Sequence, residues 1–295
     1  MDYNQSGNID LHIHSNASDG SLTPAQILHQ AAACGLSAIA ITDHDTVGGA
    51  ADALQQEIPE RLAFLTGLEL STAFPEGFDC AGSMHVLGYG IDVASPQLLL
   101  MLQKQQEARA GRNPAIIEKL NRLGIEISLA QVASEAGTDS VSRPHIGACL
   151  VRQGYAADMD EAFDRYLGRG QPAYVDKYRI PVREGIAAIT AAGGIAVLAH
   201  PGLLPEDCAS RLEEMISQLA SLGLGGIEVY YPGHTAAQTA TYERLCNAFG
   251  LLMTGGTDFH GDINPKIHMG RGLGDLHIPY AIYRRLAESL AAKPE

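Results

Sequence analysis

Histidine and carboxylate residues occur at spacings that suit metal binding, beginning near the amino end of the chain. His12 and His14 are two residues apart in the segment IDLHIHS. Because the side chains of a β-strand alternate between its two faces, both imidazoles would point the same way and could bind one ion. Asp19 follows in the polar turn SNASDG, where ordinary turn chemistry is the alternative explanation.

The next two apolar segments also carry charged residues. The run SAIAIT is followed directly by Asp43, His44 and Asp45, and Glu69 lies inside the apolar run LAFLTGLELS. A buried carboxylate costs several kcal/mol unless it is paired or bound to a cation. Glu69 is therefore expected to face a cation.

The same pattern recurs along the rest of the chain, where nearly every candidate strand carries His, Asp or Glu at or just beyond its carboxyl end. The further candidates are His85, Arg143, His145, His200, Glu228, Asp258 and His260. Each has an ordinary structural explanation when taken singly, but their joint occurrence favours a common site. The remaining histidines lack this placement and are predicted to be surface residues; they are His29, His234, His268 and His277.

Imidazole and carboxylate ligands without thiolates suit Zn, Mn, Fe or Co, and Mg where carboxylates dominate. The candidates outnumber the ligands that one ion can use, so two or three ions sharing a bridging carboxylate are expected. Such ions stabilise the attacking and leaving oxygens during the hydrolysis of phosphate esters. These residues predict a metal-dependent phosphoesterase, and a non-catalytic metal-binding regulatory domain is the alternative of another class.

Seven apolar runs are predicted to be the β-strands that position these residues. They alternate with helix-length segments, one of which begins at Thr23 and Pro24 and ends at Gly35. This alternation indicates an α/β fold with a parallel sheet covered on both faces, and α/β barrels place their active sites at the carboxyl ends of the strands. The strands are expected at residues 9–13, 37–42, 62–71, 84–91, 195–200, 226–231 and 251–256.

The alternation fails between about residues 95 and 172, where the sequence is helical in character. Residues 103–172 also differ in charge, because they hold nine acidic and nine basic residues. We therefore predict a barrel domain made of residues 1–102 and 173–295, with residues 103–172 as a mainly helical insert. The sequence indicates neither the role of the insert nor the oligomeric state.

The chain as a whole is acidic, with 34 Asp and Glu against 20 Lys and Arg and a net charge of −14. The first 102 residues hold 12 of the acids and a single base, Arg61. A protein that binds duplex DNA through a basic face would usually have the opposite sign. The charge therefore argues against duplex DNA as a partner, although not against a small phosphorylated nucleotide or a short RNA end.

The cysteines and the amino-terminal residues indicate the compartment. Five scattered cysteines without a CxxC pair suggest neither a disulfide framework nor a thiolate zinc site, so reduced thiols are expected. The first ten residues lack the features of a secretory signal, and no run approaches the ~18 apolar residues of a membrane span. A cytoplasmic protein without a membrane partner is predicted.

Eight motifs in this order resemble the PHP (polymerase and histidinol phosphatase) family of metal-dependent phosphoesterases. They are DLHIHSNASDG, ITDHD, GLELS, MHVLGYG, SRPHIG, LAHPG, GIEVYY and GGTDFHG. The resemblance implies a distorted (β/α)7 barrel. Within the family the sequence is most similar to small bacterial phosphoesterases that act on 3′,5′-nucleoside bisphosphates, some of which are also 5′→3′ exoribonucleases and which carry a helical insert.

The resemblance implies a trinuclear metal centre with Glu69 as a bridge. One ion would take His12, His14, Glu69 and Asp258, the second Glu69, His85 and His145, and the third Asp19, His44 and His260. Many relatives have His at the position of Asp19, and the extra negative charge favours Mn or Mg at that site. Manganese is the expected metal, with Fe, Zn and Mg as alternatives. Asp43 is expected to orient the His44 imidazole rather than to bind an ion.

Substrate phosphate requires cationic groups besides the metals. His200 is the candidate acid for the leaving oxygen or a donor to the phosphoryl group, with a further metal ligand as its alternative role. Arg143 precedes His145 by two residues, and Lys177 and Arg179 follow the insert. Together the three cations would form a second phosphate pocket, although a solvated loop also explains Lys177 and Arg179.

The predicted reaction is removal of the 3′-phosphate from a 3′,5′-nucleoside bisphosphate, such as adenosine 3′,5′-bisphosphate. Trimming of short oligoribonucleotides from the 5′ end uses the same chemistry. Hydrolysis of histidinol phosphate is the alternative, and it needs one phosphate pocket.

Overall fold

The computed structural model of the 295-residue chain describes residues 7–80, 82–136, 141, 143–176 and 178–292. The chain divides into two compact units. The first combines Met1–Leu102 with Arg179–Glu295, and the second is Gln103–Tyr178. Each unit has its own apolar core.

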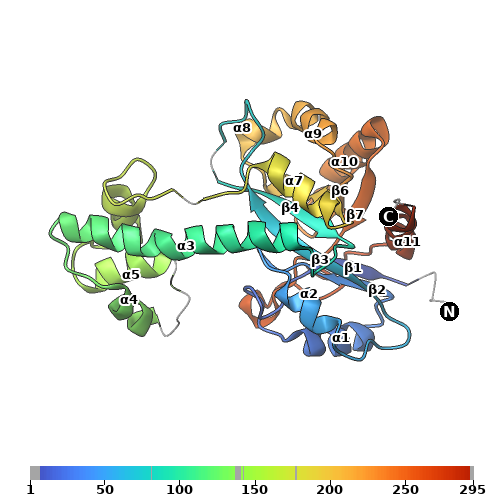
Figure 1. Cartoon of the computed structure of the whole chain (residues 1–295), viewed down its shortest axis with the longest axis horizontal. Helices are drawn as coiled ribbons and strands as arrows, with labels where there is room; N and C mark the ends of the chain where they lie inside the picture. The colour runs from blue at the N-terminus through green and yellow to red at the C-terminus, as the bar shows by residue number, and fades with distance from the viewer. Residues whose placement is uncertain (1–6, 81, 137–140, 142, 177, 293–295) are drawn as a thin grey trace. The chain divides into compact units, whose positions relative to one another are not determined.

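The first unit is built on a seven-stranded sheet whose strands are hydrogen-bonded in chain order (Figure 1). All seven predicted strands are present, with ends within two residues of those expected. They are β1 (Ile9–Ile13), β2 (Ala38–Ile41), β3 (Ala63–Thr72), β4 (Met84–Tyr89), β5 (Ile195–Leu198), β6 (Gly226–Tyr230) and β7 (Leu252–Gly255).

The sheet curls so that the segment after β7 reaches β1. The His14 amide donates to the Phe259 carbonyl over 2.9 Å, and the Phe259 amide donates to the His12 carbonyl over 3.3 Å. This closure gives the distorted barrel that the sequence resemblance implied. It also brings the residues that follow β7 beside the end of β1.

The expected all-parallel sheet is wrong at β4, which is antiparallel to both β3 and β5. Residues 73–83 join β3 to β4, and the described part of this link contains no helix. A parallel pair needs a crossover of a dozen or more residues, usually helical, whereas an antiparallel pair accepts a shorter link. The remaining neighbouring strands are parallel.

Helices cover the sheet. The predicted cap of the first helix is confirmed, because the Thr23 side chain accepts from the Gln26 amide in a capping box. The helices of this unit are α1 (Pro24–Ala33), α2 (Gly48–Ala53), α7 (Val182–Ala191), α8 (Glu206–Ala209), α9 (Leu212–Ser221), α10 (Ala236–Phe249) and α11 (Tyr280–Ala291), with 3-10 turns η2 (Pro201–Leu203) and η3 (Gly261–Ile263).

The two faces of the sheet belong to different apolar clusters. Leu87 and Tyr89 of β4 pack with α11 residues such as Leu286. Val86 of β4 and Leu68 of β3 point to the other face and pack with residues of α7 and α9. Glu69 pairs with Leu87 across the sheet and so lies on the Leu87 face.

The second unit is helical in its described residues and packs around a separate apolar core that includes Ile116, Ile146 and Leu150. The helix α3 (Pro96–Arg122) begins among residues of the first unit and ends in the second. The others are α4 (Leu129–Ala136), α5 (Arg143–Arg152), α6 (Met159–Ala162) and the π-helical turn η1 (Phe163–Leu167).

The expectation that all cysteines are thiols is wrong for one pair. Cys80, in the link before β4, forms a disulfide with Cys208 of α8, and their Cα atoms are 6.1 Å apart. The two positions are 128 residues apart in the chain, so no local spacing signals the bridge. Across the described ranges, the helices lack the combination of length and apolarity that a membrane crossing requires.

Candidate metal centre

The strand ends that carry the predicted ligands meet at one edge of the curled sheet. His12 and Glu69 lie near the carboxyl ends of β1 and β3, whereas His85 lies near the beginning of β4. The antiparallel direction of β4 explains this difference, because its amino end lies at the same edge as the carboxyl ends of its neighbours. His85 consequently pairs with Ser71 at the end of β3.

Glu69 is at the centre of the cluster and is fully buried. Its two carboxylate oxygens lie 2.9–3.4 Å from nitrogen atoms of five imidazoles. These belong to His12, His14, His44, His85 and His200. Burial alone would raise the pKa of Glu69, but the neighbouring imidazoles hold it well below its ordinary value. One carboxylate is thus shared by five imidazoles from four segments of the chain.

The four residues expected around the first ion lie together. Nε2 of His14 is 3.1 Å from Asp258 Oδ1 and 3.3 Å from Glu69 Oε2. Nε2 of His12 is 3.4 Å from each of the same two carboxylates and 3.1 Å from His14 Nε2. One potential ligand atom from each of these residues lies within 4.8 Å of all the others. Asp258 has a φ of 56°, so the chain takes a left-handed turn at this ligand.

Asp19 lies among three imidazoles on the more exposed side of the cluster. Its oxygens are 3.4 Å from His260 Nε2, 3.5 Å from His14 Nδ1 and 3.8 Å from His44 Nε2. Despite partial burial, these imidazoles lower the pKa of Asp19 below its usual range. The set expected around the third ion is therefore assembled, with His14 beside it.

A third group joins His44, Glu69 and His85. Two of its members, Glu69 and His85, are residues expected around the second ion, and His44 was expected around the third. His145 was the remaining member, and it lies on α5 in the second unit. Its assignment as a ligand stays a prediction.

The donor atoms of the cluster fit divalent ions. Buried polar atoms are normally hydrogen-bonded, yet several here lack a partner of suitable geometry. They are His14 Nδ1, His44 Nδ1, Glu69 Oε2, His85 Nδ1 and Asp258 Oδ1. All five atoms belong to the groups described above. Imidazole nitrogens and carboxylate oxygens that converge in this way, without thiolates, suit Mn, Fe, Zn or Mg.

The structure gives Asp43 a different role from the one expected. Its oxygens accept from the Ser15 amide and hydroxyl and from the Ser18 hydroxyl, each over 2.7 Å. Asp43 therefore fixes the turn that carries Asp19, rather than the His44 imidazole. The adjacent Asp45 accepts from the Ser71 amide and hydroxyl over 2.8 and 3.0 Å.

Two further polar residues, His234 and Asp10, make buried contacts that were not predicted from the sequence. His234 is partly buried: its Nδ1 lies 2.9 Å from the Val229 carbonyl, and its Nε2 accepts from the Gly202 amide over 3.2 Å. The prediction that His234 is a surface residue is therefore wrong. Asp10 is buried and binds the Thr257 amide and hydroxyl, which fixes the segment before Asp258. Burial raises the pKa of Asp10 to about 6, although these hydrogen bonds oppose the shift.

Glu228 of β6 and Tyr231 just beyond it also contact predicted site residues. Glu228 is fully buried, and its Oε1 lies 2.9 Å from His12 Nδ1. The Tyr231 hydroxyl donates to Asp258 Oδ2 over 3.2 Å. Neither role was assigned from the sequence, although a glutamate inside the apolar run GIEVYY was the available signal.

The residues expected to bind phosphate lie in different parts of the structure. His200 lies in the cluster, with Nε2 3.0 Å from Glu69 Oε1. Arg179 precedes Ile180, which bridges Thr72 at the end of β3. Arg143 begins α5 in the second unit, where its guanidinium lies over the rings of Phe163 and Tyr174. Lys177 lies outside the described residues.

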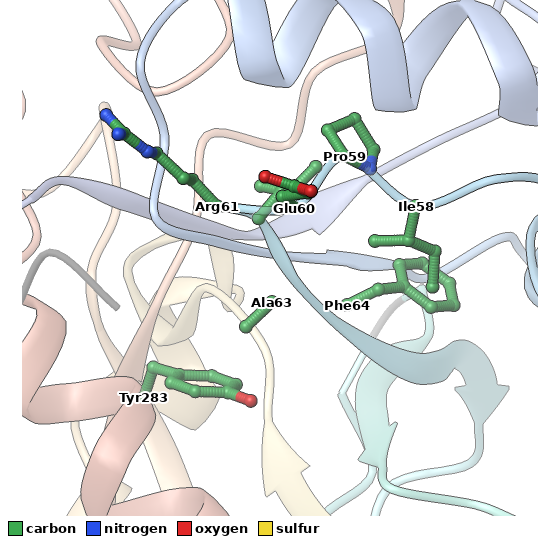
Figure 2. A pocket seen from close by; sticks show the side chains of 8 residues that line it. Ile58, Pro59, Glu60, Arg61, Ala63, Phe64 and Tyr283 are labelled. Atoms are coloured by element: carbon green, nitrogen blue, oxygen red, sulfur yellow. The ribbon is translucent and has the colours of Figure 1, made fainter. Parts of the chain in front are cut away.

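A separate pocket of about 690 Å³ lies at the other end of β3 (Figure 2). It is lined by the segment before and at the start of β3, from Ile58 to Phe64, and by Tyr283 of α11. None of the predicted ligands lines it. This pocket is therefore separate from the edge where the imidazoles gather.

Three similarities to known proteins agree with this geometry. A model of the PHP domain matches residues 10–110. The chain is 32% identical over 261 residues to the 3′,5′-nucleoside bisphosphate phosphatase of Chromobacterium violaceum, covering 86% of this chain and 87% of the relative. It is 34% identical over 251 residues to the 5′-3′ exoribonuclease of Haemophilus influenzae, covering 85% of this chain and 89% of the relative.

A solved structure shares the fold. It is an amidohydrolase from Chromobacterium violaceum with bound sulfate and no metal, with a TM-score of 0.69 and 32% identity, covering 95% of this chain and 96% of that one. The curled sheet and the cluster at its edge are thus those of a phosphoesterase, a hydrolase of phosphate esters. The chain belongs to the PHP family.

Proposed function

We propose that this protein removes the 3′-phosphate from 3′,5′-nucleoside bisphosphates with the help of divalent metal ions. The observation that carries the proposal is the cluster around Glu69, in which potential ligand atoms converge and five buried ones have no hydrogen-bond partner of suitable geometry. Such a cluster suits phosphate ester hydrolysis. The similarity to the Chromobacterium violaceum phosphatase supports the choice of substrate.

Eight of the nine expected ligands lie in this cluster and would hold two or three ions, with Mn expected. They are His12, His14, Asp19, His44, Glu69, His85, Asp258 and His260. When bound, the ions lower the pKa of a water molecule and take up negative charge from the phosphoryl oxygens. His145 is proposed to complete the set.

His200 is proposed to act on the leaving oxygen. In the reaction, a water oxygen bonds to phosphorus, the bond from phosphorus to the ribose 3′-oxygen breaks, and that oxygen must gain a proton. Burial would lower the pKa of His200, but Glu69 and Glu228 raise it above the ordinary value of an imidazole. This direction favours the protonated imidazole, the form that can donate a proton to the leaving oxygen. Ligation of a further ion is its alternative role.

The non-reacting 5′-phosphate needs its own cations. Arg179 lies beside the cluster edge, because Ile180 pairs with Thr72, the next residue after Ser71, which in turn pairs with His85. We propose Arg179, with Arg143 and Lys177, as the ligands of this phosphate. The sulfate bound to the Chromobacterium violaceum structure is consistent with an anion site in this family.

Trimming of short RNA from its 5′ end is a second candidate activity, favoured by the similarity to the Haemophilus influenzae exoribonuclease. It requires the same centre and a terminal phosphate pocket. Histidinol phosphate is the competing substrate with one phosphate.

The test compares phosphate or nucleotide release by the Mn²⁺-loaded protein from three substrates. These are adenosine 3′,5′-bisphosphate, a short 5′-phosphorylated RNA and histidinol phosphate. We expect the highest kcat/KM for the bisphosphate. A clear preference for histidinol phosphate would overturn the substrate assignment, and release from none of them with metal bound would overturn the catalytic one.

A further inference from the structure

The strand β6 supplies none of the nine expected metal ligands, yet its central carboxylate contacts two residues of the site. Glu228 Oε1 lies 2.9 Å from His12 Nδ1, and Glu228 Oε2 accepts from the His200 amide over 2.7 Å. The side chains of Glu228 and His12 are both fully buried. Both oxygens of this carboxylate are therefore engaged, one by an imidazole and one by a main-chain amide.

The first contact selects one form of the His12 imidazole. An ionised carboxylate only accepts hydrogen bonds, so Nδ1 of His12 must carry the proton that it donates to Glu228. In the neutral imidazole the lone pair is then on Nε2. This is the atom that lies 3.4 Å from Glu69 Oε2 and 3.4 Å from Asp258 Oδ1, inside the first ligand group.

The second contact holds the backbone of His200 in an unusual conformation. His200 has φ 24° and ψ 62°, outside the regions that residues other than glycine usually adopt. The following Pro201 further restricts this residue. Its carbonyl accepts from the Leu203 amide over 2.9 Å. The hydrogen bond from the His200 amide to Glu228 fixes the amide side of the same residue. In this position the His200 Nε2 atom lies 3.0 Å from Glu69 Oε1.

We infer that Glu228 is a positioning residue that presents His12 Nε2 to the metal and, through the backbone, fixes His200 beside it. This inference rests on the proposed metal centre and deepens it. Carboxylates that hold the second nitrogen of a metal-bound imidazole set its orientation and basicity, and their loss typically costs 10- to 100-fold in metal affinity or activity.

The carboxylate is required because it accepts two hydrogen bonds from opposite sides. A glutamine has the same shape but offers one oxygen and one NH₂ group. If its oxygen accepts from the His200 amide, its NH₂ faces His12 Nδ1 and favours the proton on Nε2, the atom needed for the metal. If its oxygen accepts from His12, its NH₂ opposes the His200 amide. Glu228→Gln therefore satisfies one contact at the expense of the other.

The first experiment measures Mn²⁺ affinity by competition with a fluorescent chelator for the wild type, Glu228→Gln and Glu243→Gln. Glu243 is the matched control, because it accepts a hydrogen bond from the Tyr230 hydroxyl on the same strand and contacts no predicted ligand. We expect ~10- to 100-fold weaker binding for Glu228→Gln and wild-type binding for Glu243→Gln. Affinity of Glu228→Gln within twofold of the wild type would overturn the inference.

The second experiment needs no variant at position 228. The ¹⁵N shifts of ¹⁵N-histidine-labelled wild-type protein loaded with diamagnetic Zn²⁺ report which nitrogen of each imidazole carries a proton. The His12 signal is assigned by its loss in His12→Gln. We expect a proton on Nδ1, and a proton on Nε2 would contradict the inference. A wild type that binds no divalent ion would instead refute the proposed metal centre itself.

Discussion

Glu69 and Glu228 are both buried glutamates inside β-strands of the same sheet, but their surroundings differ. Glu69 faces five imidazoles, and its Oε2 has no hydrogen-bond partner of suitable geometry. Glu228 has both oxygens engaged, by the His12 ring and the His200 amide. An unsatisfied buried carboxylate indicates a place for an ion, whereas a satisfied one supports its neighbours. The distinction separates residues proposed to bind metal from those that hold them in place.

Removal of the Glu69 charge should have the largest effect. In Glu69→Gln an NH₂ group replaces one oxygen of the carboxylate that two of the three ligand groups share. We expect loss of bound metal and a fall in kcat/KM for the bisphosphate of at least ~1000-fold, or ~4 kcal/mol of transition-state stabilisation. Metal content by mass spectrometry and steady-state kinetics measure the two effects. Full turnover by the variant would contradict the bridging role.

Metal binding should depend strongly on pH. Burial would lower the imidazole pKa values of His14 and His44, but Glu69 and, for His14, Asp258 raise them above the ordinary value. The metal-free cluster therefore holds protons that an ion must displace, so affinity should rise with pH. We expect ~1.4 kcal/mol per pH unit for each proton released.

Calorimetric titration with Mn²⁺ in two buffers of different ionisation enthalpy counts these protons. More protons should be released near pH 6.5 than near pH 8, because fewer imidazoles of the metal-free protein stay protonated as the pH rises. Heats that are identical in both buffers at both pH values would show that no proton is displaced.

Replacement of Arg179 should affect the substrate with two phosphates selectively. We expect Arg179→Ala to raise KM for adenosine 3′,5′-bisphosphate ~10-fold, about 1.4 kcal/mol, and to leave KM for histidinol phosphate unchanged. Arg183→Ala is the control, because Arg183 is exposed on α7. Equal effects of Arg179→Ala on both substrates would remove Arg179 from a second phosphate pocket.

The smallest effect is expected from the Tyr231 hydroxyl, which supports a ligand as Glu228 does but through one hydrogen bond. Tyr231→Phe keeps the ring beside His200 and should weaken Mn²⁺ binding ~5-fold, about 1 kcal/mol. Tyr155→Phe, which loses a hydroxyl in the second unit, should bind like the wild type. An unchanged affinity for Tyr231→Phe would show that the Tyr231 hydroxyl does not support Asp258.

The sequence predicted most of what depends on local pattern. The apolar runs located all seven strands, and polar residues at their ends indicated the edge where the cluster lies. The start of α1 was likewise visible in the N-cap residue Thr23 and the first-turn Pro24. These features are set by neighbouring residues, so a single sequence contains them.

Features that depend on distant contacts were missed. The Cys80–Cys208 bridge joins segments that meet only through folding. The antiparallel direction of β4 follows from the short link before it, and this signal was overlooked. Asp43 stood beside His44 in the chain but binds Ser15 instead. Glu228 was visible in the sequence as an acid inside an apolar run. Its two partners, His12 and His200, belong to distant segments, so its role became clear only from the structure.

The most direct test of the account is phosphate release from adenosine 3′,5′-bisphosphate by protein first stripped of metal with a chelator and then titrated with Mn²⁺. We predict no turnover by the stripped protein and recovery that follows the bound Mn²⁺, with AMP and phosphate formed in equal amounts. Turnover by the stripped protein, or none after Mn²⁺ has bound, would contradict the assignment of this cluster as a metal-dependent phosphatase centre.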